Sequence, residues 1–162
     1  MSILLYQDIN PYQLQALLGR YGLEIETVST DVAIPGSFWK APEAGLIGNR
    51  LYLSGATPVH SALHEACHYI CMDRSRRENL HTDAGGTAIE ENAVCYLQTL
   101  LADFIPEMGR ARSFSDMDEW GYSFRLGSAQ AWFEEDAEEA LAWLQQHKLV
   151  DSEEQPSFLL RQ

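Results

Sequence analysis

The spacing of hydrophobic and polar residues predicts a chain that mixes helices and strands. Residues 10–22 begin with an Asn-Pro pair, continue with leucine and tyrosine at helical spacing and end in glycine, which indicates a capped amphipathic helix. Residues 23–29 (LEIETVS) alternate apolar and polar side chains, as a half-buried strand does. The Pro- and Gly-rich segment 34–45 is expected to be a surface loop.

The middle of the chain predicts a hairpin and two long helices. Residues 46–53 (LIGNRLYL) place a Gly-Asn pair between two apolar runs, which is a signal for a tight hairpin with a primed turn. Over residues 57–72 the spacing becomes helical, after a Thr-Pro pair that supplies an N-cap and a first-turn proline. A polar linker, 73–86, leads into a second helix over 87–103, which ends before a proline.

The last third of the chain is more polar. Residues 109–119 form a polar stretch, and an acidic helix is expected over 128–147. One side of that helix carries the apolar residues Trp132, Phe133, Ala140, Leu141 and Leu144. We interpret its acidic run, EEDAEEA, as a solvated helix face.

Composition narrows the class of protein. The 162 residues, of which 46% are hydrophobic, suit one domain with a real core, so a single domain over 1–162 is expected. With 11 Lys and Arg against 24 Asp and Glu, the formal charge of −13 repels nucleic-acid phosphates and anionic membranes, and we exclude both as partners. No segment approaches the roughly 18 uncharged residues that cross a bilayer, and no basic leader is visible, so a cytoplasmic protein is expected.

The predicted helix 57–72 contains the sequence HEACH, which suits a metal site. Residues four apart lie on the same side of a helix, so His64 and His68 can direct ring nitrogens to one ion at about 2.0–2.1 Å. Glu65 is turned by about 100° from His64, which places it near the ion but toward a bound water. A zinc ion with three protein ligands lowers the pKa of such a water toward about 7, and Glu65 would accept its proton as general base.

The other residues of this helix favour a metal site over coincidence. The two histidines and Glu65 share one side, and the apolar residues share another: Val59, Ala62, Leu63, Ala66 and Ile70. His60, Cys67 and Cys71 lie near the edge of the histidine side, but turns about 5.4 Å apart cannot all reach one ion. We therefore interpret Cys67 and Cys71 as reduced thiols that pack. His60 is either an ordinary histidine or a support for a ligand or a helix end.

A third metal ligand is expected from the start of the helix 87–103. Glu90 is the favoured candidate because its neighbours at i+3, i+4 and i+7 are small or apolar, which indicates that it points inward. Glu91 shares a side with more polar residues and is a weaker candidate. Asp83 and His81 in the preceding linker also stay open.

HEACH and the later stretch EENAVCYLQTLL together resemble the zincin metallopeptidases that have a glutamate ligand. The chain is most similar to the ImmA/IrrE-type family, whose second helix reads approximately E-x-x-A-x-x-F-x-x-x-L-L. The similarity covers residues 57–106, and the corresponding positions are Glu90, Ala93, Tyr96, Leu100 and Leu101. The chain departs from that family at Cys67, where a glycine is usual, and at Val94, where an acidic residue or Asn is common.

The resemblance implies a small α+β zincin-like domain, in which a short twisted mixed or antiparallel sheet packs on the active-site helix. A second, ligand-bearing helix and C-terminal helices complete it. It also implies zinc-dependent cleavage of peptide bonds in a protein or peptide substrate, with a regulatory protein as one candidate. His64, His68 and Glu90 would bind Zn²⁺, and Glu65 would be the general base.

Two further questions stay open at the level of sequence. A residue that stabilises the tetrahedral oxyanion is expected in such a site, and His81, Tyr52 and Tyr122 are candidates. The alternatives to a peptidase are a non-catalytic interaction domain of the same fold and a structural domain without metal. In the latter, neighbouring carbonyls and carboxylates would bond the histidines.

Overall fold

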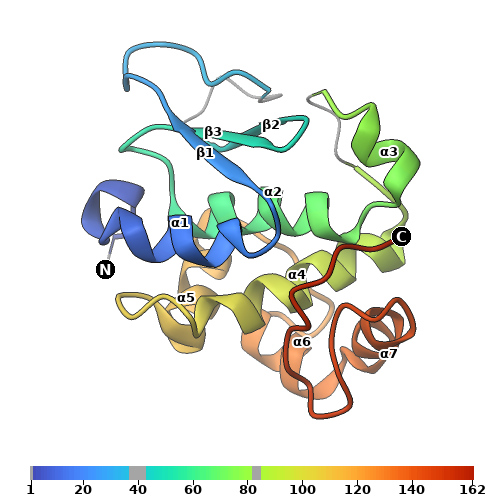
Figure 1. Cartoon of the computed structure of the whole chain (residues 1–162). Helices are drawn as coiled ribbons and strands as arrows, with labels where there is room; N and C mark the ends of the chain where they lie inside the picture. The colour runs from blue at the N-terminus through green and yellow to red at the C-terminus, as the bar shows by residue number, and fades with distance from the viewer. Residues whose placement is uncertain (1, 37–42, 82–84) are drawn as a thin grey trace.

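The computed structural model describes residues 2–36, 43–81 and 85–162, which form an α+β fold (Figure 1). In the first half of the chain the elements are η1 (Tyr6–Asp8), α1 (Pro11–Gly19), β1 (Glu24–Thr27), β2 (Gly45–Ile47), β3 (Arg50–Leu53) and α2 (Val59–Cys71). In the second half they are α3 (Arg74–Glu78), α4 (Ala88–Ala102), α5 (Gly109–Trp120), α6 (Ala129–Glu135) and α7 (Glu138–Gln146).

The sheet is small and mixed. Its strand order is β1-β3-β2, with β1 parallel to β3 and β2 antiparallel to β3. The predicted hairpin is confirmed as β2 and β3, and Gly48 has a φ of 59° at the first central position of its turn. A positive φ at that position is the reason that the turn needs glycine.

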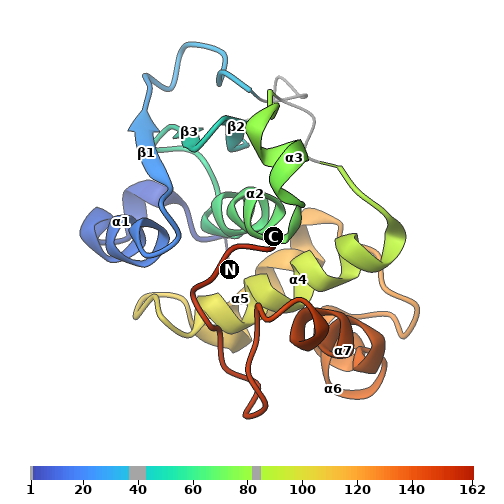
Figure 2. The same ribbon diagram turned by 45° about the vertical axis from the view of Figure 1, so that its right-hand side comes forward.

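Helix α2 is the centre of the molecule. It lies between the sheet and α4 in both Figure 1 and Figure 2, and it contacts both. Eleven of its 13 residues are buried, and the two that are not are His64 and Glu65. The helix is therefore packed on nearly all sides, and it reaches solvent mainly at His64 and Glu65.

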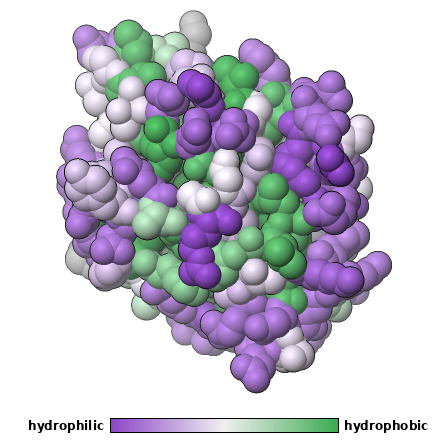
Figure 3. Space-filling model, in the orientation of Figure 1, coloured by the Kyte–Doolittle hydropathy of each residue, from purple (hydrophilic) through white to green (hydrophobic). Residues whose placement is uncertain are grey.

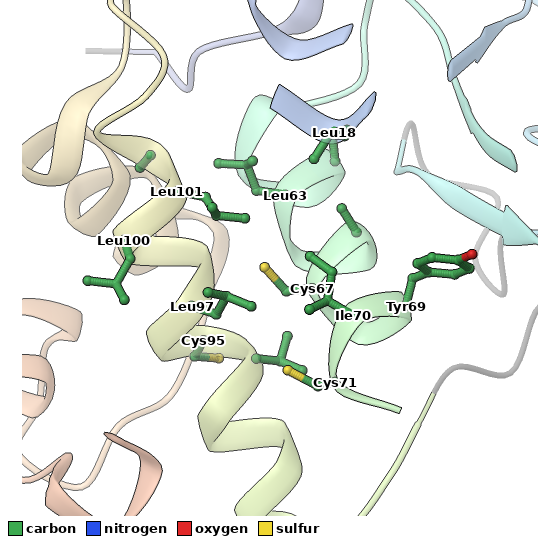
Figure 4. Close-up of a cluster of buried hydrophobic side chains, with 14 of the residues drawn as sticks. Leu18, Leu63, Cys67, Tyr69, Ile70, Cys71, Cys95, Leu97, Leu100 and Leu101 are labelled. Carbon is green, nitrogen blue, oxygen red and sulfur yellow. The ribbon is translucent and has the colours of Figure 1, made fainter. Parts of the chain in front are cut away.

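One hydrophobic cluster joins the sheet, α2 and α4. Figure 4 shows Cys67 and Cys71 of α2 and Cys95 of α4 among leucines of the two helices. All three cysteines are free and buried, as expected for small packing residues. Because side chains from both helices interdigitate here, the relative position of α2 and α4 is fixed by the core.

The structure corrects several predicted boundaries. Helix α2 begins at Val59, and the hydroxyl of Thr57 accepts the N–H of Ser54 and does not cap the helix. The polar linker contains a short helix, α3, which Asp73 caps. The polar stretch 109–119 is also helical, because α5 buries Phe114 and Met117 on one side.

The expected acidic helix 128–147 is two helices, α6 and α7, which are separated at Asp136 and Ala137. Its apolar side is nevertheless the buried one, since Trp132, Ala140 and Leu144 are all in the core. The predicted helices 10–22 and 87–103 are confirmed as α1 and α4, and the side chains of Asn10 and Thr87 cap them.

Two features describe the surface. Hydrophilic residues cover most of the face seen in Figure 3, with small groups of hydrophobic residues among them. Within the described residues, each helix is too short or too polar to cross a membrane.

Candidate metal centre

Two helices bring three possible ligand atoms to one point. His64 and His68 lie one turn apart on α2, and their Nε2 atoms are 3.1 Å apart. Oε1 of Glu91, on the first turn of α4, lies 3.0 Å from Nε2 of His64 and 3.3 Å from Nε2 of His68. Two imidazoles and a carboxylate whose donor atoms meet in this way could hold a metal ion.

The site opens to solvent on one side. The His68 side chain is 6% exposed and that of His64 is 17% exposed, whereas the Glu91 side chain is 44% exposed. The histidines are therefore fixed by packing, while the carboxylate lies at the mouth of the site. An ion at this point would be accessible to water and to small ligands from the Glu91 side.

Glu90, expected to be the third ligand, lies elsewhere. It is 2% exposed, and its carboxylate receives two hydrogen bonds from Arg76, at 2.7 and 2.9 Å, and one from Arg161, at 3.0 Å. One residue along a helix is a rotation of about 100°, so Glu90 and Glu91 cannot face the same partner. The structure thus corrects the expectation: Glu90 does point inward, but toward two arginines, and Glu91 is the carboxylate beside the histidines.

The other candidates for the third ligand differ in position. Asp83 lies outside the described residues. His81 is exposed, and its backbone pairs with Ile47 at the edge of the sheet. The group of His64, His68 and Glu91 therefore takes its only carboxylate from α4.

Glu65 lies next to His64 but is not one of the three converging residues. Burial raises the pKa of its carboxyl; His64 and His68 act in the opposite direction, and the carboxylates of Glu91 and Glu43 raise the pKa further. The net result is a pKa above the usual value for a glutamate. A carboxylate with a raised pKa is suited to accept a proton and to return it near neutral pH.

The charges of His64 and Glu91 depend on each other. Burial opposes a charge on His64, but Tyr122, Cys95 and Glu91 together raise its pKa well above the usual value. Burial also opposes the charge of Glu91, yet hydrogen bonds from His64 and His68 hold the pKa of its carboxyl well below the usual range. Without an ion, the site therefore holds a proton between an imidazole and a carboxylate, and a metal ion must displace it.

A second layer of residues lies behind His64. The side chain of Gln98, on α4, places Oε1 2.9 Å from Nδ1 of His64 and donates Nε2–H to the backbone carbonyl of His60 at 3.1 Å. The Tyr122 hydroxyl lies 3.3 Å from Nδ1 of His60, and the Tyr122 ring packs against the rings of His60 and His64. His60 is thus a buried histidine whose carbonyl supports Gln98.

This layer bears on the predicted oxyanion stabilisers. The Tyr122 hydroxyl contacts His60 and Gln98 on the Nδ1 side of His64, whereas the candidate ligand atom of His64 is Nε2. Tyr52 is half-buried on β3. Sequence reasoning missed Gln98, although Glu91, Cys95 and Gln98 repeat at i, i+4 and i+7 and so share the side of α4 that faces His64.

Comparison with protein-family models, with curated proteins and with solved structures finds no match for this chain. The resemblance to the ImmA/IrrE-type family therefore rests on the motif residues alone.

Proposed function

We propose that the protein is a zinc-dependent peptidase in which His64, His68 and Glu91 bind the metal and Glu65 is the general base. The observation that carries this proposal is that Nε2 of His64, Nε2 of His68 and Oε1 of Glu91 lie 3.0–3.3 Å from one another. Glu65 is the neighbour of His64 in the sequence. Two imidazoles and one glutamate are a ligand set of catalytic zinc sites, which keep a position open for water.

A bound Zn²⁺ would supply Lewis-acid chemistry and a water of lowered pKa. The protein's own residues would do the remainder. Glu65, with its raised pKa, would accept the proton of the attacking water and pass it to the leaving amine. Glu91 at the exposed mouth leaves room for a peptide to approach the site.

The substrate class follows from the resemblance to the zincin peptidases and not from the site geometry. A protein or peptide is the proposed substrate, and a regulatory protein is one candidate. The net charge of −13 favours a partner that is not itself strongly acidic.

A second function, a non-catalytic metal-binding domain, is favoured by one observation. The hydroxyl of Tyr122, one of the three candidates for stabilising an oxyanion, is hydrogen-bonded behind His64. A site that lacks such a donor would bind the ion and stabilise the α2 and α4 pair without cleaving peptides.

The test compares metal content with activity. Untagged protein reconstituted with zinc should contain one equivalent per chain and should cleave a mixed peptide library. Glu65→Gln should keep the zinc and the fold but lose at least about 100-fold in kcat/KM, since general acid-base catalysis contributes about 10²–10⁴-fold. Glu134→Gln, on the exposed side of α6, is the matched control and should keep full activity. Peptide cleavage that is unchanged in Glu65→Gln would contradict the proposed mechanism, and one zinc without cleavage would favour the non-catalytic domain.

A further inference from the structure

Gln98 joins the candidate ligand His64 to the backbone of α2 by hydrogen bonds at both ends of its side-chain amide. It is fully buried, and it is two turns along α4 from Glu91. One end of its amide faces Nδ1 of His64, and the other end faces the carbonyl of His60. A buried amide with a partner at each end is fixed in both position and direction.

The direction of the amide follows from the nature of the His60 group. A backbone carbonyl can only accept a hydrogen bond, so the NH₂ end of Gln98 must face it. The oxygen of Gln98 then faces Nδ1 of His64, at 2.9 Å. Because that oxygen can only accept, Nδ1 must carry the hydrogen.

The same logic determines the other ring nitrogen. A neutral imidazole carries one hydrogen, so a hydrogen on Nδ1 leaves Nε2 with a free lone pair. Nε2 of His64 is the atom that lies 3.0 Å from Glu91 and 3.1 Å from Nε2 of His68. Once the proton that Nε2 shares with Glu91 is lost, the lone pair of Nε2 points to the place where an ion would bind.

We propose that Gln98 is a positioning residue that holds His64 in the Nδ1–H tautomer, with Nε2 directed to the metal. The proposal rests on the metal site proposed above. Gln98 also fixes the rotation of the ring, because its amide is bonded to the backbone of the same helix that carries His64. The supporting atom is neutral, so it directs the ligand without adding charge to a site that already contains Glu65 and Glu91.

The second histidine provides a contrast. Nδ1 of His68 is buried and has no hydrogen-bond partner within the described part of the chain. Its ring, which is 6% exposed, is held by packing and by the contacts of Nε2 with Glu91 and His64. The loss of Gln98 should consequently disturb one ligand and leave the other in place.

The test distinguishes the effect of losing the hydrogen-bond acceptor of Gln98 from the effect of changing its packing. Gln98→Met keeps the volume but removes the acceptor, and Gln98→Glu keeps an acceptor for Nδ1–H but places a carboxylate oxygen against the His60 carbonyl. Thr99→Val is the matched control, because Thr99 is equally buried on α4 and its hydroxyl bonds the carbonyl of Cys95. Two readouts are measured: ¹⁵N NMR of the His64 ring in metal-free protein, at a pH where the ring is neutral, and zinc affinity by chelator competition.

In the wild-type protein the ¹⁵N spectrum should show hydrogen on Nδ1 of His64. Gln98→Met should show both tautomers and should bind zinc about 10–100-fold more weakly, the usual effect of losing such a support. Gln98→Glu should retain the Nδ1–H tautomer and most of the zinc affinity although it is less stable than Gln98→Met. Thr99→Val should match the wild type in both readouts.

The results also distinguish this proposal from the metal site itself. A wild-type His64 that carries its hydrogen on Nε2 overturns the proposal. This result comes from the wild-type protein and does not depend on whether a variant folds. A Gln98→Met protein with unchanged tautomer and zinc affinity overturns it as well, while the metal site stands. If wild-type protein binds no zinc, the proposed function fails, and the tautomer in the metal-free protein still decides the role of Gln98.

Discussion

Neighbouring glutamates have opposite roles in this protein. Glu90 is buried between Arg76 and Arg161, whereas Glu91 lies beside His64 and His68. The sequence indicated correctly that Glu90 faces inward, because apolar residues follow it at helical spacing. It could not indicate what Glu90 meets there, since its partners come from a linker and from the end of the chain.

Replacing each glutamate by glutamine, which removes the charge but keeps the shape, should therefore have different effects at the two positions. Glu90→Gln leaves two guanidinium groups without their buried carboxylate and should lower the free energy of unfolding by about 3 kcal/mol. Glu91→Gln should lower that free energy less, because the Glu91 side chain is 44% exposed, but it should weaken zinc binding roughly 100-fold, about 2.7 kcal/mol. Urea unfolding of metal-free protein and chelator competition measure the two quantities. The reverse assignment, with zinc affinity lost in Glu90→Gln, would restore Glu90 as the ligand.

At the scale of the elements, the helices that carry the site were the most predictable parts. The long periodic runs that became α2 and α4, and the Gly-Asn turn between β2 and β3, each depend on local pattern. Helix α5 was missed because its sequence is polar, and it is helical only because the fold buries Phe114 and Met117. The position of Glu90 was not predictable for a related reason, since it depends on its ion pair with Arg76 of α3 and no local pattern records that contact.

The ion pair between Arg76 of α3 and Glu90 of α4 lies against a glycine. A Cβ atom at Gly86, just before α4, would lie 1.6 Å from Oε2 of Glu90 and 3.2 Å from the Arg76 guanidinium. Gly86→Ala must displace this buried ion pair and should lower the free energy of unfolding by about 1–3 kcal/mol. At Gly19, in α1, a Cβ meets nothing within 4 Å, so Gly19→Ala should be neutral or stabilising by up to about 1 kcal/mol. Thermal unfolding distinguishes the two, and equal stability would mean that Glu90 has room to move.

At the scale of the whole molecule, acid should destabilise the fold partly through His60. Burial, and then the nearby His64, lower the pKa of His60 from 6.5 to about 3. The unfolded chain therefore binds a proton that the folded protein does not, and stability is complete above pH 6.5 and falls as the pH drops toward 3. The expected slope is about 1.4 kcal/mol per pH unit in that range.

The contribution of His60 can be isolated by comparing His60→Phe with the wild type. The variant keeps a buried ring and the backbone carbonyl that supports Gln98, but it has no group to protonate. Urea unfolding between pH 4 and pH 7, all on metal-free protein, should show a smaller loss of stability in the variant. Parallel curves for the two proteins would mean that His60 does not remain neutral in the folded state.

The most direct measurement is a crystal structure of zinc-loaded protein with anomalous diffraction recorded on both sides of the zinc absorption edge. We expect one anomalous peak per chain, at about 2.0–2.2 Å from Nε2 of His64, Nε2 of His68 and a carboxylate oxygen of Glu91. A peak bound by Glu90, or the absence of a peak at these three residues under saturating zinc, would contradict the account.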